Sequence, residues 1–258
     1  MPHADNDSVA PPPDPKMVTT AMQLRKEFTA IQLQNEFAID EVLTKVSILR
    51  KEFLQLHRYN PIEHVNSRLK SPESTLKKII RLGVAPTAAS IREHVKDIAG
   101  VRITCSFIAD TYRVLDALTS QDDVSVVRVR DYIKHPKPNG YKSLHALIEI
   151  PVFLSTGPVP VTVEVQVRTI AMDFWASLEH KIYYKYEGSV PSHLVENLTA
   201  AARVSEELDE KMEKLYSEVR DLQGDDYRTD IDGVAGDLDL ERLQDLWRSA
   251  ASQVTRAE

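Results

Sequence analysis

The chain has 258 residues, and its 32 Lys and Arg residues against 39 Asp and Glu residues give a formal net charge of −7. This acidity excludes a protein that binds duplex nucleic acid over its whole surface, and 42% apolar with 28% charged residues excludes a disordered or fibrous chain. The single cysteine, Cys105, excludes a disulfide framework and a Cys-rich zinc site. The lone cysteine favours a reducing, cytoplasmic setting. Because no apolar run approaches the roughly 20 residues of a membrane helix, we expect a soluble protein that does not enter a membrane.

The sequence divides into a tail, a main domain and a C-terminal extension. Residues 1–16 contain five prolines, which predict a disordered or extended tail without a secretory signal. Residues 17–222 are expected to form one domain. Residues 223–258 are expected to form an acidic linker followed by a helix at about 238–251.

Helices are predicted first. Apolar residues between positions 17 and 53 recur at spacings of three and four, which indicates an amphipathic helix or a broken pair of helices. Ser71 is expected to cap a helix that opens at Pro72 and closes at Gly83. Residues 87–96 predict a short helix, and Asp110 is expected to cap another over residues 111–121.

Four segments then read as strands, at residues 101–107, 124–133, 141–153 and 159–169. The last segment alternates valines on one face with Glu164, Gln166 and Arg168 on the other. Gly100, just before the first of these strands, is expected to allow a close backbone approach. Helices are predicted at 170–188 and 192–222, the second with a heptad-like apolar stripe from Leu194 to Leu222. The predicted fold is α+β, a mixed or mostly antiparallel sheet of four or more strands flanked by N-terminal and C-terminal helices.

Charge is distributed unevenly along the chain. Residues 128–142 hold five Lys or Arg and one Asp, whereas residues 205–245 hold fifteen Asp or Glu and five Lys or Arg. Two carboxylates, Asp97 and Glu164, stand at the end or on the face of a predicted strand, apart from the basic clusters. Acidic ligands for Mg²⁺ together with cationic groups are the combination that phosphoryl-type transfer requires.

Five segments resemble, in order, the synthetase domain of the RelA/SpoT-type alarmone synthetases. They are the basic residues within 68–78, DIAGVR at 97–102, PKPNGYKSLH at 136–145, EVQVRT at 164–169 and MDFWASLEHKIYYKY at 172–186. The resemblance implies a nucleotidyltransferase-like mixed sheet and transfer of pyrophosphate from ATP to the ribose 3′-hydroxyl of GDP or GTP. The product would be the stringent-response alarmone (p)ppGpp, with release of AMP. Because none of the eight histidines is followed by Asp, the chain is similar to the small members of the family that lack the hydrolase.

The resemblance also implies a role for individual residues. Asp97 and Glu164 match the catalytic and Mg²⁺-binding acids, of which Glu164 activates the 3′-hydroxyl. The ATP-binding positions are Arg68, Lys70, Ser74, Lys78, Arg102 and Arg130, with Arg68 and Arg102 on either side of the adenine. The GDP- or GTP-binding positions are Lys137, Asn139, Tyr141, His145, Gln166 and Arg168, with Tyr141 stacked on the guanine and Glu179 completing the pocket. The family resemblance further suggests a homotetramer.

Other interpretations remain open from the residues alone. A nucleotidyltransferase that moves a nucleoside monophosphate would need a Gly-Ser turn followed by paired aspartates, a pattern that this sequence lacks. A module that binds a nucleotide or single-stranded RNA without turnover could use the basic residues and tyrosines, although Asp97 and Glu164 would oppose such binding without metal. Ser74 could serve only in a helix cap and His145 only as a structural residue. Trp175, Tyr183 and Tyr186 are expected to be core residues.

Overall fold

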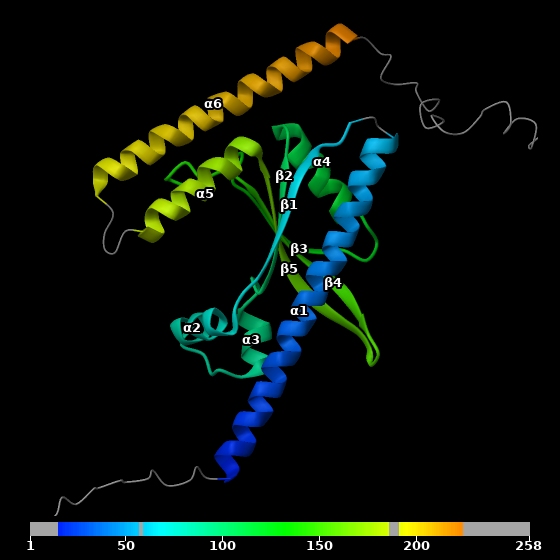
Figure 1. The fold of residues 1–258 in the computed structure, drawn as a ribbon, viewed down its shortest axis with the longest axis vertical. Coiled ribbons are helices and arrows are strands. Elements are labelled where there is room, and N and C mark those ends of the chain that lie inside the picture. The colour runs from blue at the N-terminus through cyan, green and yellow to red at the C-terminus, as the bar shows by residue number, and fades with distance from the viewer. Residues whose placement is uncertain (1–14, 57–58, 186–190, 224–258) are drawn as a thin grey trace, which may run out of the picture.

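The structure, a computed structural model, describes residues 15–56, 59–185 and 191–223 (Figure 1). Its centre is a five-stranded sheet in the order β1-β2-β5-β4-β3, in which only β2 and β5 run parallel. The strands are β1 (Ile62–Leu69), β2 (Ala99–Cys105), β3 (Ser125–Asp131), β4 (Leu144–Leu154) and β5 (Gly157–Thr169). The helices are α1 (Pro15–Leu56), α2 (Pro72–Leu82), α3 (Ala88–His94), α4 (Ile108–Thr119), α5 (Ile170–Lys185) and α6 (Ser192–Gln223). The α+β prediction with a mixed sheet is therefore confirmed.

One face of the sheet forms the core with α1 and α4. The alternating residues Val101, Ile103, Val163 and Val165 are fully or almost fully buried on this face, in one cluster with residues of both helices. Because strand side chains alternate between faces, the intervening residues project from the opposite face. The sheet therefore has an apolar side that stabilises the fold and a second side that remains available for polar side chains.

The helix predictions are mostly confirmed, with one clear error. Helix α1 is one continuous helix of 42 residues, which decides between the two alternatives for this segment. Ser71 caps α2 by accepting a hydrogen bond from the Ser74 amide, and Gly83 ends the helix with a left-handed φ of 69°. Of the tail predicted at 1–16, residues 15 and 16 belong instead to α1. Residues 1–14 and the helix predicted at 238–251 lie outside the described residues. None of the helices in the described ranges is both long and apolar enough to cross a membrane.

The predicted cap at Asp110 is wrong. Helix α4 begins at Ile108, so Asp110 lies inside its first turn, where its carboxylate accepts a hydrogen bond from the Tyr59 hydroxyl. The free amide of Ile108 is bound instead by the Glu213 carboxylate of α6, at 2.8 Å. A side chain more than 100 residues further along the chain thus performs the capping role, which local sequence could not reveal.

Two further expectations changed. The edge strand β1 was not predicted. At Gly100, an added Cβ would make only ordinary contacts, 3.6 Å from the Arg68 carbonyl oxygen and 3.9 Å from that of Glu164, so no close backbone approach requires glycine there.

Trp175 is buried as predicted, and its indole Nε1 donates to the Leu198 carbonyl of α6 at 2.9 Å. The side chain of Tyr183 and the whole of Tyr186 are outside the described part.

Candidate active site

The residues expected to act in chemistry share the sheet face turned away from α1 and α4. The strand register shows this directly, because residues paired across neighbouring strands point to the same side. Gly100 pairs with both Arg68 and Glu164, and Arg102 pairs with Gln166. His145 of β4 in turn pairs with Gln166 and with Arg130 of β3. Polar side chains from all five strands of the sheet order therefore converge on one surface.

Asp97 stands immediately before β2 and is held by two lysines. Its Oδ2 lies 2.8 Å from Nζ of Lys70, and its Oδ1 lies 2.7 Å from Nζ of Lys78. Burial alone would raise the pKa of Asp97, but the two ammonium groups hold it below its usual value. The carboxylate is therefore ionised at neutral pH, and both lysines are positioned beside it.

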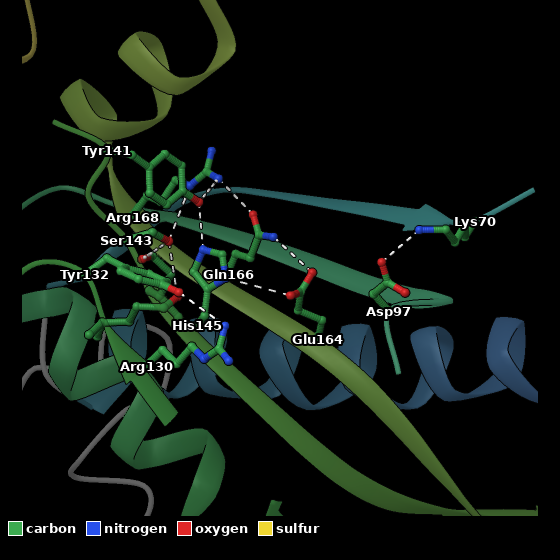
Figure 2. A network of polar contacts seen from close by, with 12 residues as sticks. Lys70, Asp97, Arg130, Tyr132, Tyr141, Ser143, His145, Glu164, Gln166 and Arg168 are labelled. Atoms are coloured by element: carbon green, nitrogen blue, oxygen red, sulfur yellow. Dashed lines mark hydrogen bonds and ion pairs between the residues drawn. The ribbon is translucent and has the colours of Figure 1, made fainter. Parts of the chain in front are cut away.

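Glu164 is the second carboxylate of this surface. Its Oε1 lies 3.8 Å from Nδ1 of His145, and its Oε2 accepts a hydrogen bond from Nε2 of Gln166 at 3.1 Å. The neighbouring His145 holds the pKa of Glu164 below its usual value, while partial burial acts in the opposite direction. Glu164 is thus also ionised and fixed in place by neighbours on two strands (Figure 2).

Asp97 and Glu164 line the same cavity, which has a volume of about 310 Å³. Lys78, Arg130 and His145, which are expected to bind substrate, are also part of its wall. Three further basic residues line it that the sequence reasoning did not select, namely His94, Lys96 and Arg128. Arg128 was identifiable as a member of the basic run 128–142. His94, the last residue of α3, and Lys96, in the segment before β2, belong to no motif.

A second polar network surrounds Tyr141, next to this cavity (Figure 2). The Tyr141 hydroxyl lies 2.7 Å from Nε2 of His145 and accepts a hydrogen bond from Nη2 of Arg168 at 2.6 Å. Arg168 also donates to Oε1 of Gln166 at 2.9 Å, which links this network to Glu164. Since His145 contacts both Tyr141 and Glu164, the two parts of the site form one connected surface.

The loop that carries Tyr141 is shaped by its own side chains. Asn139 Oδ1 accepts from the Tyr141 amide at 3.2 Å, and Gly140 donates its amide to the Lys137 carbonyl in a tight turn. The Lys137 ammonium lies 4.5 Å from the centre of the Tyr141 ring. Asn139 Nδ2 also donates to Glu179 of α5 at 3.1 Å, so Glu179 ties this loop to α5.

The expected ATP-binding residues are only partly brought together. Arg68 and Arg102 lie on the same face of adjacent strands, two positions apart in the register, because Arg68 pairs with Gly100 and Arg102 with Asn66. Arg68 is exposed, and Arg102 contacts Asp173 of α5. Ser74 is exposed at the start of α2, where its hydroxyl accepts from the Ser71 hydroxyl, and it does not line the cavity of Asp97 and Glu164.

The donors on this surface fit a magnesium ion. Among the described residues no group of three or more His, Cys, Asp or Glu side chains could enclose a metal by themselves. Mg²⁺ is commonly held by one or two carboxylates together with substrate phosphates rather than by a cage of protein ligands. Two ionised carboxylates in the wall of one cavity match that mode.

Comparison with known proteins identifies the family of the chain. The family model described as "Region found in RelA / SpoT proteins" matches residues 67–189. GTP pyrophosphokinase YwaC of Bacillus subtilis is 52% identical over 184 residues, which cover 71% of this chain and 88% of YwaC.

Solved structures are similar over most of their length. Small alarmone synthetase 2 of Bacillus subtilis gives a TM-score of 0.68 at 48% identity, covering 74% of this chain and 99% of that chain. Small alarmone synthetase 1 of the same organism, bound to its product pppGpp, gives 0.69 at 34% identity, covering 75% and 98%. The same synthetase bound to AMPCPP gives 0.64 at 31% identity, covering 76% and 98%. The chain therefore belongs to the small alarmone synthetases of the RelA/SpoT family.

Proposed function

We propose that this chain transfers pyrophosphate from ATP to the ribose 3′-hydroxyl of GDP or GTP, forming ppGpp or pppGpp and AMP. The observation that carries the proposal is the pair of ionised carboxylates, Asp97 and Glu164, in the wall of one basic cavity. In the reaction, the 3′-oxygen attacks the β-phosphorus of ATP, the bond from that phosphorus to the α-phosphate oxygen breaks, and AMP leaves.

The two substrates are assigned to opposite sides of this carboxylate pair. The ATP side comprises Lys70 and Lys78 with the pair of Arg68 on β1 and Arg102 on β2, whose planar guanidinium groups suit stacking on adenine. Arg130, in the cavity wall, adds a cation for the transferred phosphates. Ser74, exposed at the start of α2, is the least supported member of this set.

The guanosine nucleotide is assigned to Tyr141 and its surroundings. A tyrosine ring can stack on a base, and Lys137, Asn139, His145, Gln166 and Arg168 surround Tyr141 or contact its neighbours. The crystal structures of small alarmone synthetase 1 bound to pppGpp and to AMPCPP support a site that accepts a guanosine and an adenosine nucleotide.

Glu164 is proposed to accept the proton of the attacking 3′-hydroxyl. It lies beside His145, which contacts Tyr141 on the guanosine side. Its lowered pKa keeps it ionised at neutral pH and thus able to accept a hydrogen bond from that hydroxyl. Gln166 and His145 hold the carboxylate, which limits the reorganisation needed during the reaction.

Asp97, together with Glu164, would hold Mg²⁺. When bound, the ion would neutralise charge that develops on the phosphate oxygens. Asp97 is paired with Lys70 and Lys78 in the structure. When the substrates bind, both lysines would release this carboxylate and bind the phosphates of ATP instead.

We further propose that the chain is a homo-oligomer, expected to be a tetramer, and that it acts in the cytoplasm. The support for self-association is the apolar stripe of α6, which is exposed in the single chain: Val204 is 66% and Leu208 is 52% accessible. Together with residues of α5 such as Phe174, it lines an open groove of about 850 Å³. Contiguous exposed apolar surface of this kind is typical of protein interfaces.

A test of the reaction separates this function from its rivals. The purified protein is incubated with ATP, GDP and Mg²⁺, and the nucleotides are separated by ion-exchange chromatography. Formation of AMP and ppGpp in equal amounts is expected, and none when EDTA replaces Mg²⁺. Free pyrophosphate would indicate transfer of a nucleoside monophosphate, and binding of GDP without any product would indicate a module that binds but does not react.

A further inference from the structure

Helix α6 carries a row of small and polar residues beside its apolar stripe, and this row makes specific contacts with the rest of the molecule. The row consists of Ala202, Glu206, Asp209 and Glu213, spaced by four, three and four positions. Tyr216 continues it and stacks on Phe107. The apolar stripe described above lies beside this row and lines the open groove together with α5. Since a helix normally docks through its apolar stripe, the inward polar row needs a separate explanation.

The first contact of this row reaches the segment 136–142, which we name the acceptor loop because it carries Tyr141. Gly140 has a φ of 86°, a value that L-residues rarely adopt, and a Cβ added there would overlap the Cβ of Ala202. The backbone of the loop therefore rests directly on α6. Tyr141 packs beside this point, against a buried cluster of Trp175, Ala176 and Ala202.

The second contact is an ion pair. Lys142, at the end of the acceptor loop, donates to the Glu206 carboxylate of α6, and the lysine side chain is only 14% exposed. Glu206 lies one helical turn after Ala202, so the two residues hold two positions of the loop, Gly140 and Lys142, on either side of Tyr141. A restraint on both sides of Tyr141 fixes the direction in which its ring points.

The helix itself is anchored without the loop. The Asp209 carboxylate accepts from the Thr169 hydroxyl at the end of β5, at 2.7 Å, and Trp175 of α5 donates to the Leu198 carbonyl at 2.9 Å. Glu213 binds the first amide of α4. Helix α6 is therefore tied to a strand and two helices, and its position does not depend on the acceptor loop.

We infer that α6 is the positioning element of the acceptor loop, and that Ala202 and Glu206 set the affinity for the guanosine nucleotide by holding Gly140 and Lys142. The inference rests on the proposed function, since it takes the loop to bind GDP or GTP. Neither Ala202 nor Glu206 lines the carboxylate cavity. They are positioning residues, and their substitution should change the KM for GDP while the KM for ATP stays constant.

The ion pair is tested by charge exchange. Lys142→Glu and Glu206→Lys are each expected to raise the KM for GDP about tenfold, a size typical of coupling between residues in contact. The double variant restores the pair in reverse and is expected to return the KM to within about threefold of wild type. If Lys142 instead acted by touching the nucleotide, Lys142→Glu would lose affinity and the second change would not restore it. That result would overturn the inference.

The contact of Gly140 with Ala202 is tested by steric exchange. Gly140→Ala should raise the KM for GDP, and adding Ala202→Gly should recover part of the loss, because it removes the overlap but not the strained φ. Ala202→Leu should raise the same KM, whereas Ala200→Leu, an equal change at an exposed position of α6, should not. No recovery in the double variant, or equal effects at positions 200 and 202, would contradict the inference.

Two readouts separate failure of the inference from failure of the function. Binding of GDP is measured directly by isothermal titration calorimetry, and the KM values for GDP and ATP are measured from AMP formation. A wild-type protein that binds GDP but forms no AMP rejects the proposed function, while the calorimetric comparison still decides the positioning role. An active wild type whose charge-exchange and steric variants keep the wild-type KM for GDP rejects the positioning role alone. Thermal unfolding of each variant confirms that it is folded.

Discussion

Arg102 and Arg168 share one carboxylate oxygen. Oδ1 of Asp173 lies 3.2 Å from Nη1 of Arg102 and 3.0 Å from Nη1 of Arg168. Arg102 belongs to the proposed ATP side and Arg168 contacts Tyr141 on the guanosine side, so Asp173 joins the two halves of the site. This acid lies in the first turn of α5, within the motif at 172–186, but was not selected from it.

Asp173→Asn should therefore weaken both substrates together. Loss of a charged hydrogen-bond acceptor of this kind costs about 1.5 to 3 kcal/mol, and we expect the KM values for ATP and for GDP both to rise. Steady-state kinetics with one substrate saturating and the other varied would measure this. A rise in only one KM would show that the shared contact does not couple the two halves.

The two cavity carboxylates should both be essential for turnover. Asp97→Asn and Glu164→Gln remove a charge without much change in shape, and each is expected to lower kcat by about 10² to 10³. The measurement is AMP formation at saturating ATP and GDP. Asp116→Asn, at an exposed carboxylate on α4, is the matched control and should keep the wild-type rate. Near-normal turnover of a folded Asp97 or Glu164 variant would remove that residue from the mechanism.

Tyr141 should determine affinity for the guanosine nucleotide. Tyr141→Ala removes a stacking surface worth about 1 to 3 kcal/mol, so the KM for GDP should rise while that for ATP changes little. Tyr141→Phe keeps the ring but loses the hydroxyl contacts to His145 and Arg168, so its effect should be smaller and measurable. Weakened ATP binding with unchanged GDP binding in the alanine variant would reverse the assignment of the two substrates.

The buried carboxyl of Asp209 should give the protein a specific pH dependence. Burial raises its pKa from 3.8 to about 6, against the Thr169 hydroxyl and Lys142, which lower it, and with Glu213, which adds to the rise. The folded state therefore binds this proton more tightly than the unfolded state, and the contribution to stability falls as pH rises from about 4 to 6.

The corresponding test compares wild type with Asp209→Asn. Asparagine can still accept the Thr169 hydrogen bond but does not titrate. We expect the free energy of unfolding of the variant to decrease less between about pH 4 and pH 6 than that of wild type. Urea unfolding at several pH values measures the difference. Parallel pH profiles for the two proteins would show that Asp209 does not titrate in this range.

The apolar stripe of α6 should be an interface between copies of the chain. Light scattering at micromolar concentration is expected to give the mass of an oligomer, and Leu208→Glu should reduce that mass because it buries a charge in the interface. Glu207→Ala, at the adjacent exposed position, is the control. A monomeric mass for the wild-type protein would refute the oligomer.

Strands β2 to β5 were predicted from the sequence, but the edge strand β1 was not, for a physical reason. In β5 the apolar and polar residues alternate strictly, and the strand runs as predicted to Thr169. In β1 the apolar residues Ile62, Val65 and Leu69 are three and four positions apart, a helical spacing. An irregularity between Ile62 and His64 shifts the register of this strand and breaks its alternation.

The candidate site was predictable where a motif lay on one segment and unpredictable where contact joined distant segments. Asp97 and Glu164 were chosen from separate motifs, and the structure places both in one cavity. Asp173, Glu206 and Asp209 escaped notice because an acidic residue on a helix is usually a solvated one. Their partners lie on β2, β5 and the acceptor loop, and only the packing of α5 and α6 reveals them.

The alternation of side chains along the thirteen residues of β5 gives this strand two separate roles. Odd positions such as Val163 and Val165 build the core, and even positions such as Glu164 and Gln166 carry the chemistry. An insertion or deletion of one residue before Glu164 would exchange the two sets, driving carboxylate and amide groups against α1 and valines into the cavity. A single-residue insertion or deletion in β5 would therefore disrupt the core and the site together. Substitutions at even positions can alter substrate preference without disturbing the core.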